Sequence, residues 1–164
     1  MQKSAGIWIG LSLLIIVLDQ LTKWWANTAL NFGEQVNVLP FFNLTLVYNT
    51  GAAFSFLADA GGWQRWVLSS LSLVVSVMLT LWILRTPREF KWLAIGLALV
   101  LGGAVGNLID RAFFGYVVDF LDVYYQQWHW PAFNVADSAI TVGAGILILE
   151  TLWGKSASQP ANNW

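Results

Sequence analysis

The stretch WVLSSLSLVVSVMLTLWIL, residues 66–84, decides the fold class, because it holds 19 consecutive residues without a charge. Crossing a bilayer as a helix requires about 20 apolar residues, at a rise of about 1.5 Å each. A second stretch of this kind, residues 92–109, contains 18 residues and no charge. Two such stretches in close succession predict an integral membrane protein.

The composition of the whole chain agrees with this assignment. Of 164 residues, 57% are hydrophobic and 10% are charged, whereas a soluble domain has about 25% charged residues. These values exclude a soluble enzyme and a disordered chain. The net charge of −1 argues against a nucleic-acid partner, which requires clustered basic residues. Cysteine is absent, which excludes a disulfide framework and a zinc–thiolate site.

Two further spans flank the obvious ones, and both draw acidic residues into the membrane region. The first is uncharged over 5–18 and then meets Asp19 and Lys23. The last is uncharged only over 138–149, roughly 18 Å of helix, so it must begin before Asp137 in order to span. We therefore expect an all-α integral membrane protein with four transmembrane helices. The expected spans are 5–26, 64–84, 92–111 and 134–152, within a single domain, 1–155, that precedes a polar, disordered tail, 156–164.

Basic residues in the short connections predict the orientation. With four spans, both termini lie on the same side of the membrane. That side carries five basic residues against three on the other, which favours cytoplasmic termini. The five are Lys3, Arg85, Arg88, Lys91 and Lys155, and the three are Lys23, Arg65 and Arg111.

The two segments that this orientation places outside, 27–63 and 112–133, are unequal in character. The string FNLTLVY at 42–48 is rich in β-branched and aromatic residues and predicts a strand. Residues 52–57 could form a short interfacial helix. We therefore expect a small extracytoplasmic β-cradle beside the helices.

Small residues repeat at i,i+4 spacing on the third and fourth spans. Gly102 and Gly106 form one such pair, and Ala139 and Gly143 form the other. Small side chains allow helix backbones to approach closely in a membrane. We interpret both pairs as helix-packing positions.

All six aspartates lie on or near the outward half of the chain, where ionisable groups at membrane depth are costly and are expected to be paired or functional. Lys23 follows Asp19 at i+4, in the order that favours a helical ion pair. A structural ion pair explains both residues, and a substrate-facing role is the alternative. The six are Asp19, Asp59, Asp110, Asp119, Asp122 and Asp137.

Three polar residues end the third span on one helix face: Asn107, Asp110 and Arg111. One interpretation is an interfacial cap with a salt bridge. The other is a scaffold that orients neighbouring catalytic groups or holds the substrate backbone. The spacing alone leaves both open.

Asp119 and Asp137 form the most informative pair. Asp119 interrupts the apolar string YVVDFL, and Asp137 lies at the outer end of the fourth span, so both reach the same interface from different elements. Two carboxyl groups close together in a poorly solvated place share a proton. Such a pair can hydrolyse a peptide, because the ionised member takes a proton from water and the protonated member donates to the carbonyl. Two carboxylates that merely cap helix ends are the alternative.

The remaining ionisable side chains give weaker signals. Asp59 and Asp122 are interpreted as solvated loop acids. His129 is the only histidine, and we expect it to form a hydrogen bond at the interface. One histidine and no cysteine make a zinc site improbable, so no metal is expected.

Five strings, in this order on four spans, together resemble the lipoprotein signal peptidase (type II signal peptidase) family over nearly the whole chain. None of them departs from the family pattern. Any one alone is weak, and the set is highly specific. The strings are DQLTK at 19–23, NTGAAFS at 49–55, GGAVGNLIDR at 102–111, VVDF at 117–120 and FNVADS at 133–138.

The resemblance implies a bacterial inner-membrane aspartic endopeptidase that cleaves prolipoproteins just before a diacylglyceryl-modified cysteine, on the periplasmic side. Asp119 and Asp137 are the implied catalytic pair, with Asp110 as a rival. Prolipoproteins and membrane lipid are the implied partners; no cofactor is expected, and nothing demands more than a monomer. The implied supporting or substrate-binding residues are Asp19, Lys23, Asn49, Gly51, Asn107, Asp110, Arg111 and Asn134.

Two other classes of function stay open on sequence grounds. A small proton-coupled transporter would use intramembrane carboxylates as a relay and would need a polar path to the cytoplasmic side. A non-catalytic membrane assembly factor would clamp a partner helix through its small-residue faces. The assembly factor would tolerate carboxamides at Asp119 and Asp137.

Overall fold

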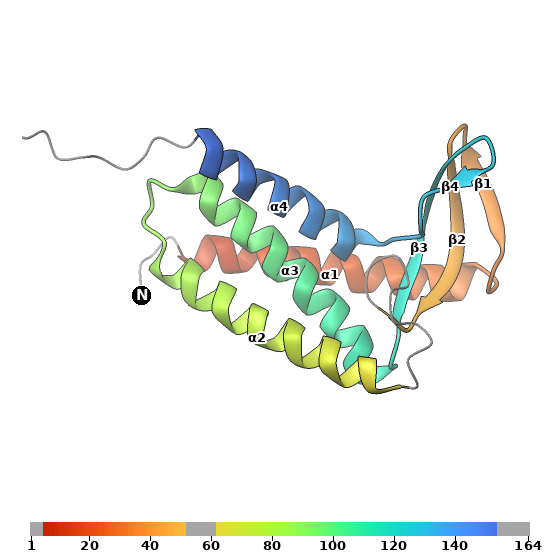
Figure 1. The fold of residues 1–164 in the computed structure, drawn as a ribbon, viewed down its shortest axis with the longest axis horizontal. Coiled ribbons are helices and arrows are strands. Elements are labelled where there is room, and N and C mark those ends of the chain that lie inside the picture. The colour runs from red at the N-terminus through yellow and green to blue at the C-terminus, as the bar shows by residue number, and fades with distance from the viewer. Residues whose placement is uncertain (1–4, 52–61, 154–164) are drawn as a thin grey trace, which may run out of the picture.

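The computed structural model describes residues 5–51 and 62–153. These residues form four helices, each long and apolar enough to cross a membrane, and a small antiparallel sheet at one end of the bundle (Figure 1). The expected fold class of four transmembrane helices with a small sheet is confirmed. The helices are α1 (Ala5–Ala29), α2 (Trp63–Arg85), α3 (Lys91–Phe113) and α4 (Val135–Trp153).

Helix α3 packs against all three other helices, and its small residues explain why it can. A Cβ atom on Gly102 would lie 2.7 Å from Ile15 Cβ on α1. A Cβ atom on Gly143 would lie 2.8 Å from the carbonyl oxygen of Gly96 on α3. Both distances are too short for a side chain, so glycine at these positions allows the helices to approach closely.

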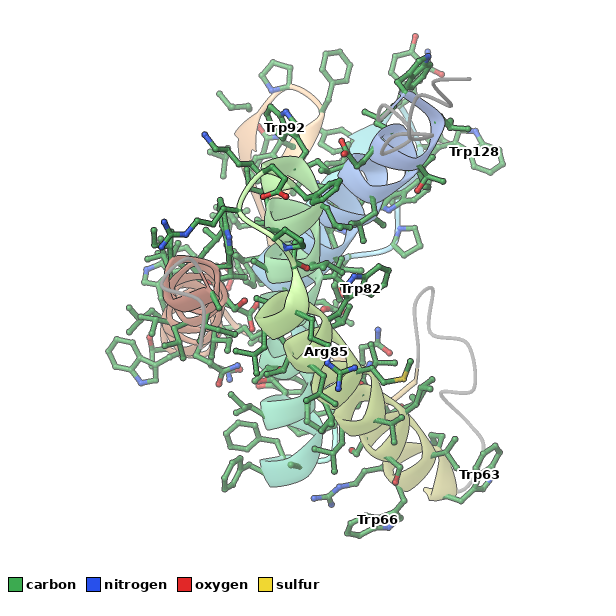
Figure 2. All side chains as sticks on the ribbon, turned by 90° about the vertical axis from the view of Figure 1, so that its left-hand side faces the viewer. Trp63, Trp66, Trp82, Arg85, Trp92 and Trp128 are labelled. Atoms are coloured by element: carbon green, nitrogen blue, oxygen red, sulfur yellow. The ribbon has the colours of Figure 1, made fainter. Side chains whose placement is uncertain are left out.

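The outward faces of the helices are apolar and exposed, as expected for surfaces that contact lipid. Figure 2 shows the side chains radiating from the bundle, seen from the end that carries Trp82 and Arg85. Trp63 and Trp66 lie on the opposite end of α2. Exposed tryptophans at both ends of the helix match the aromatic belts of a membrane protein.

Four strands form the sheet, in the order β1-β2-β3-β4, and all neighbouring strands are antiparallel. The predicted strand at 42–48 is confirmed as β2. The segment after α3 is also a strand, although the mixture of aromatic and acidic residues there did not indicate one. The strands are β1 (Gln35–Leu39), β2 (Phe42–Asn49), β3 (Val117–Tyr125) and β4 (Trp128–His129).

The interpretation of Asp122 as a solvated loop acid is wrong. Asp122 lies on β3, is 4% exposed, and accepts hydrogen bonds from Asn43 Nδ2 and from the His129 ring at 2.9 Å each. The cause is register, because Asn43 on β2 lies directly opposite Asp122. The expected hydrogen bond of His129 is confirmed by the same contact. The expected interfacial helix at 52–57, Asp59 and the tail at 156–164 lie outside the described residues.

Candidate active site

Asp119 is held on β3 in a nearly dry environment, with 2% of its surface exposed. Its Oδ1 accepts an N–H from Asn134 at 2.7 Å, and its Oδ2 accepts one from Asn49 at 3.1 Å. Burial raises the pKa of Asp119 to about 7, the negative charge of Asp137 adds to the rise, and the two amides oppose it. Asp119 is therefore a carboxyl group that can carry a proton at neutral pH.

Asp137 lies in the first turn of α4, three residues after Asn134, the residue that caps the helix. Asn134 accepts the backbone N–H of Asp137 on its side-chain oxygen at 2.9 Å, in the geometry of an N-cap. The Oδ1 of Asp137 accepts an N–H from Asn107 at 2.8 Å. The positive end of a helix dipole also favours a carboxylate in the first turn. As expected, the helix begins before Asp137.

Two amide side chains connect these carboxyl groups. Asn134 donates to Asp119 and also, at 3.3 Å, to Oδ1 of Asn107, which in turn donates to Asp137. Each amide belongs to a different element, because Asn107 is on α3 and Asn134 caps α4. The pair that the sequence singled out is thus brought to one place by α3, β3 and α4 together.

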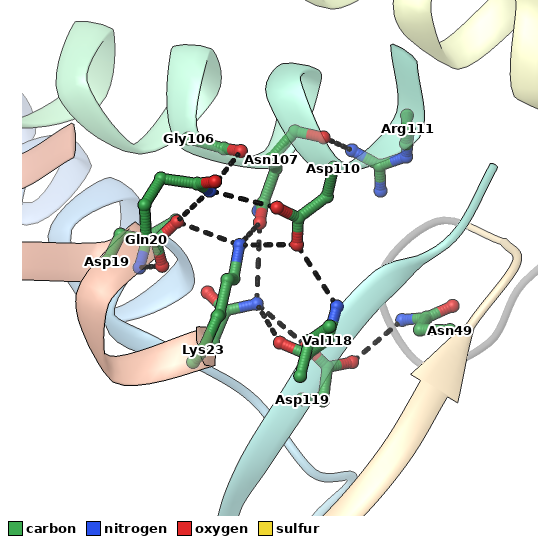
Figure 3. A network of polar contacts seen from close by, with 12 residues as sticks. Asp19, Gln20, Lys23, Asn49, Gly106, Asn107, Asp110, Arg111, Val118 and Asp119 are labelled. Carbon is green, nitrogen blue, oxygen red and sulfur yellow. Dashed lines mark hydrogen bonds and ion pairs between the residues drawn. The ribbon is translucent and has the colours of Figure 1, made fainter. Parts of the chain in front are cut away.

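Lys23 lies at the centre of a buried polar cluster (Figure 3). Its ammonium group lies 2.8 Å from Asp19, 3.0 Å from Asp110 and 2.9 Å from the side-chain oxygen of Asn107. The expected ion pair between Asp19 and Lys23 is present, and a second acid joins it. Gln20, which the sequence did not single out, adds a donor to Asp110 at 2.9 Å.

Asp110 is tied to the sheet as well as to the ion pair. Its Oδ2 accepts the backbone N–H of Val118 at 3.1 Å, next to Asp119 on β3. Its ion-pair partner is Lys23 on α1 rather than the neighbouring Arg111. These contacts place Asp110 in the cluster that supports β3.

Arg111 reaches the turn that follows β2. Its Nη2 donates to the carbonyl oxygen of Gly51 at 3.2 Å, and its Nη1 donates to the carbonyl oxygen of Asn107 at 3.5 Å. The backbone N–H of Gly51 donates to Oδ1 of Asn49 at 3.0 Å, so the turn also carries the amide that contacts Asp119. Arg111 and Asn49 thereby flank the carboxyl pair.

A cavity of about 740 Å³ opens beside these groups, between α2, α3 and α4. Its polar end is formed by Asn49, Asn107, Arg111 and Asp137. Most of its remaining wall is apolar and extends along the helices and the segment before α4. This part is lined by Leu68, Leu71, Val75, Val100, Ala104, Val117, Trp130, Pro131, Ala132, Phe133, Ile140 and Val142.

The donors around the pair are side-chain amides. Their N–H groups contact both oxygens of Asp119 and one oxygen of Asp137. Within the described ranges, no group of three histidine, cysteine, aspartate or glutamate side chains could hold a metal ion.

Comparison with known proteins places the chain in a family. Residues 11–153 match the family described as signal peptidase (SPase) II. Lipoprotein signal peptidase of Acinetobacter baumannii (strain ATCC 17978) is 58% identical, covering 90% of this chain and 84% of that protein. Lipoprotein signal peptidase of Pseudomonas putida (strain KT2440) is 54% identical, covering 95% and 92%.

A solved structure supports the same assignment. A bacterial membrane enzyme determined by the in meso method at 2.3 Å resolution matches with a TM-score of 0.81 and 29% identity. The match covers 97% of this chain and 94% of the other. The family match covers far more than half of the sequence and includes all four helices and the sheet, and the chain therefore belongs to the signal peptidase II family of membrane peptidases.

Proposed function

We propose that this protein is an aspartic endopeptidase that removes the signal peptide from diacylglyceryl-modified prolipoproteins, cleaving before the lipid-modified cysteine. The observation that carries the proposal is the amide-linked pair of Asp119 and Asp137, of which Asp137 lines the polar end of an apolar cavity. The names of its relatives support the substrate class.

The geometry suits hydrolysis by an activated water. Asp137 borders the cavity, lies in the first turn of α4 and accepts an N–H from Asn107, and it is the member of the pair that acts as the base. It takes a proton from water as the oxygen attacks the scissile carbonyl carbon. Asp119, protonated, donates to the carbonyl oxygen. Collapse of the tetrahedral intermediate then breaks the C–N bond, as Asp137 gives the proton it took from water to the leaving amine and Asp119 recovers its proton from the former carbonyl oxygen.

The cavity provides a place for an apolar substrate held in the membrane plane. Its wall along α2, α3 and α4 is open to acyl chains or an apolar peptide segment, while its polar end takes the peptide bond. The site is proposed to face the periplasmic side of the inner membrane, with both termini cytoplasmic. The enzyme is proposed to act as a monomer, with lipid and prolipoprotein as its partners.

An apolar cluster on the far side of the bundle argues for a peptidase over a proton-coupled transporter. Leu79, Ile83, Leu97, Ala98 and Leu101 pack together where such a transporter would need a polar path. Protons taken up at the carboxyl pair therefore meet an apolar barrier among the described residues. An assembly factor, by contrast, would not require two carboxyl groups linked by amides.

The deciding experiment gives a lipidated prolipoprotein peptide to the purified wild type and to Asp119→Asn and Asp137→Asn. We expect each variant to lose cleavage by at least about 10³-fold while staying folded, because the carboxamides remove the acid and base and match the carboxyl groups in size. Asp110→Asn is the matched control, and it should retain more activity than either. Cleavage that survives at Asp119→Asn or Asp137→Asn contradicts the proposal.

A further inference from the structure

We propose that Lys23 is a positioning residue whose ammonium group fixes the side-chain amide of Asn107, so that an N–H is held against Asp137 and makes it the ionised member of the pair. This inference rests on the proposed function and deepens it by assigning a role to each carboxyl group. It is carried by the contacts of three described residues on α1, α3 and α4.

The first step concerns the donors of Lys23. An ammonium group has three N–H donors and no acceptor. Lys23 is 3% exposed, and three oxygens surround its nitrogen at 2.8, 3.0 and 2.9 Å. Two belong to the carboxylates of Asp19 and Asp110, and the third is Oδ1 of Asn107. All three donors are therefore used, and each partner must present an oxygen.

The second step concerns the orientation of Asn107. If the amide were flipped, its NH₂ group would face an ammonium that has no lone pair, and its oxygen would face the carboxylate of Asp137. Both contacts would be repulsive in a site where water cannot compensate. Asn134, which donates to the same Oδ1 at 3.3 Å, favours the same orientation. Lys23 thereby fixes the Asn107 amide with its oxygen toward the ammonium group and its NH₂ group toward Asp137.

The third step concerns the two carboxyl groups. Asn107 donates to Asp137 at 2.8 Å, and a cation on the oxygen of that amide polarises its N–H and strengthens the bond. Asp119 is more deeply buried, and the Asn134 NH₂ group that serves it is shared with Val118 O and Asn107 Oδ1. Burial raises the pKa of Asp119 more than the charge of Lys23 lowers it, so Asp119 keeps the proton. Through Asn107, the same charge acts on Asp137.

The charged groups around Asp137 come from three elements. Asp119 faces it from β3, and Arg111 on α3 interacts electrostatically with both carboxyl groups. Lys23 on α1 acts through Asn107, and it forms ion pairs with Asp19 and Asp110. In the proposed reaction, the acidic limb of the pH–rate profile reports ionisation of Asp137, and the basic limb reports loss of the proton from Asp119.

The test uses the full-length enzyme and compares Asp19→Asn alone with Asp19→Asn/Lys23→Met. Lys23→Met removes the cation. Asp19→Asn is present in both variants, so that only Asp110, and not Asp19 as well, loses its ion-pair partner. We expect the double variant to show a kcat lower by about 10-fold, an unchanged KM, and an acidic limb about one pH unit higher than that of Asp19→Asn. An equal pH profile in a folded double variant would overturn the inference.

A second variant keeps the test decisive if the double variant does not fold. Asn107→Leu leaves Asp19 and Asp110 in place as ion-pair partners of Lys23 and removes the amide that joins both the cation and Asn134 to Asp137. We expect the same displacement of the acidic limb, and a wild-type profile would contradict the proposal. Failure of the proposed function is distinguishable, because Asp119→Asn or Asp137→Asn would then retain cleavage whatever the profile of these variants.

Discussion

At the scale of single residues, the proton on Asp119 determines how the enzyme responds to pH. Its pKa is raised to about 7, chiefly by burial, so the carboxyl group is protonated below about pH 7 and loses its proton above it. If Asp119 must donate to the scissile carbonyl, kcat/KM falls as the pH rises through about 7. Measuring kcat/KM across the pH range checks this prediction, and a rate that stays flat through pH 9 contradicts it.

Asn49 modulates the same group, because its N–H donates to Oδ2 of Asp119 at 3.1 Å and so favours the charged form. Asn49→Ala removes this donor, and we expect the basic limb to move about 0.5–1 pH unit higher. Asn37→Ala on β1 is the control, since Asn37 bonds Asn43 and Tyr124 rather than the carboxyl pair. A basic limb that stays in place in Asn49→Ala is the contrary result.

The sequence alone predicts the roles of some of these residues and not of others. Asp119 stands out because a charge in an apolar string has few explanations, and Asp19 and Lys23 stand out by helical spacing. Asp122 has an equally apolar neighbourhood and was misassigned, because only strand register places Asn43 opposite it. The role of Gln20 depends on contact with α3, far away in sequence, and no local pattern reports it.

At the scale of the elements, the contact between α3 and α4 positions Asp137. A Cβ atom on Gly103 would collide with the carbonyl oxygen of Ala136 and lie 2.7 Å from Ile140. Gly103→Ala therefore pushes the first turn of α4 away from α3. We expect a loss of about 1–3 kcal/mol in stability and at least about 10-fold in cleavage rate. Thermal unfolding in detergent and the cleavage assay measure the two effects.

Gly145 on α4, the helix that Gly103 of α3 contacts, provides the control for this prediction. A Cβ atom there has no neighbour within 4 Å, so Gly145→Ala should leave both stability and cleavage close to those of the wild type. Equal losses in the two variants would mean that helix propensity or expression, rather than the α3–α4 contact, causes the effect. The small residues of α3 and α4 predicted close packing, but the sequence could not say which neighbour each would meet.

The sheet depends on a polar row that crosses its strands. Asn37 on β1 contacts Asn43 on β2 at 3.1 Å, and Asp122 on β3 joins Asn43 to His129 on β4. Asp122→Leu leaves the buried amide of Asn43 and the exposed ring of His129 without this acceptor, and we expect it to cost about 1–3 kcal/mol. Asp122→Asn keeps an acceptor for Asn43 and should cost less. Thermal unfolding separates them, and equal stabilities would contradict this role.

At the scale of the whole molecule, the sequence predicts the bundle well and the sheet only in part. Four long apolar stretches leave little choice of architecture, because a membrane accepts only segments that satisfy their own backbone hydrogen bonds. Strand β3 was not indicated, because most of VVDFLDVYY is buried on both faces and shows no alternation of apolar and polar residues. Its position follows from pairing with β2, which is a long-range contact.

The orientation of the molecule is the last prediction, and the absence of cysteine makes it simple to test. Val38→Cys places a single thiol on an exposed position of β1, and Glu89→Cys places one in the exposed loop between α2 and α3 without removing a basic residue. We expect a membrane-impermeant maleimide, added to cells with a permeabilised outer membrane, to label Val38→Cys at once. Glu89→Cys should be labelled only after the inner membrane is opened.

Leu73→Cys, on the exposed apolar face in the middle of α2, is the control for lipid coverage. Its thiol should stay unlabelled in both conditions, because lipid rather than water covers that face, and should react once the membrane is dissolved and the protein is denatured. Labelling of Glu89→Cys before Val38→Cys would reverse the proposed orientation. It would place the carboxyl pair on the cytoplasmic side, because Asp119 lies at the same end of the bundle as the sheet and the polar end of the cavity.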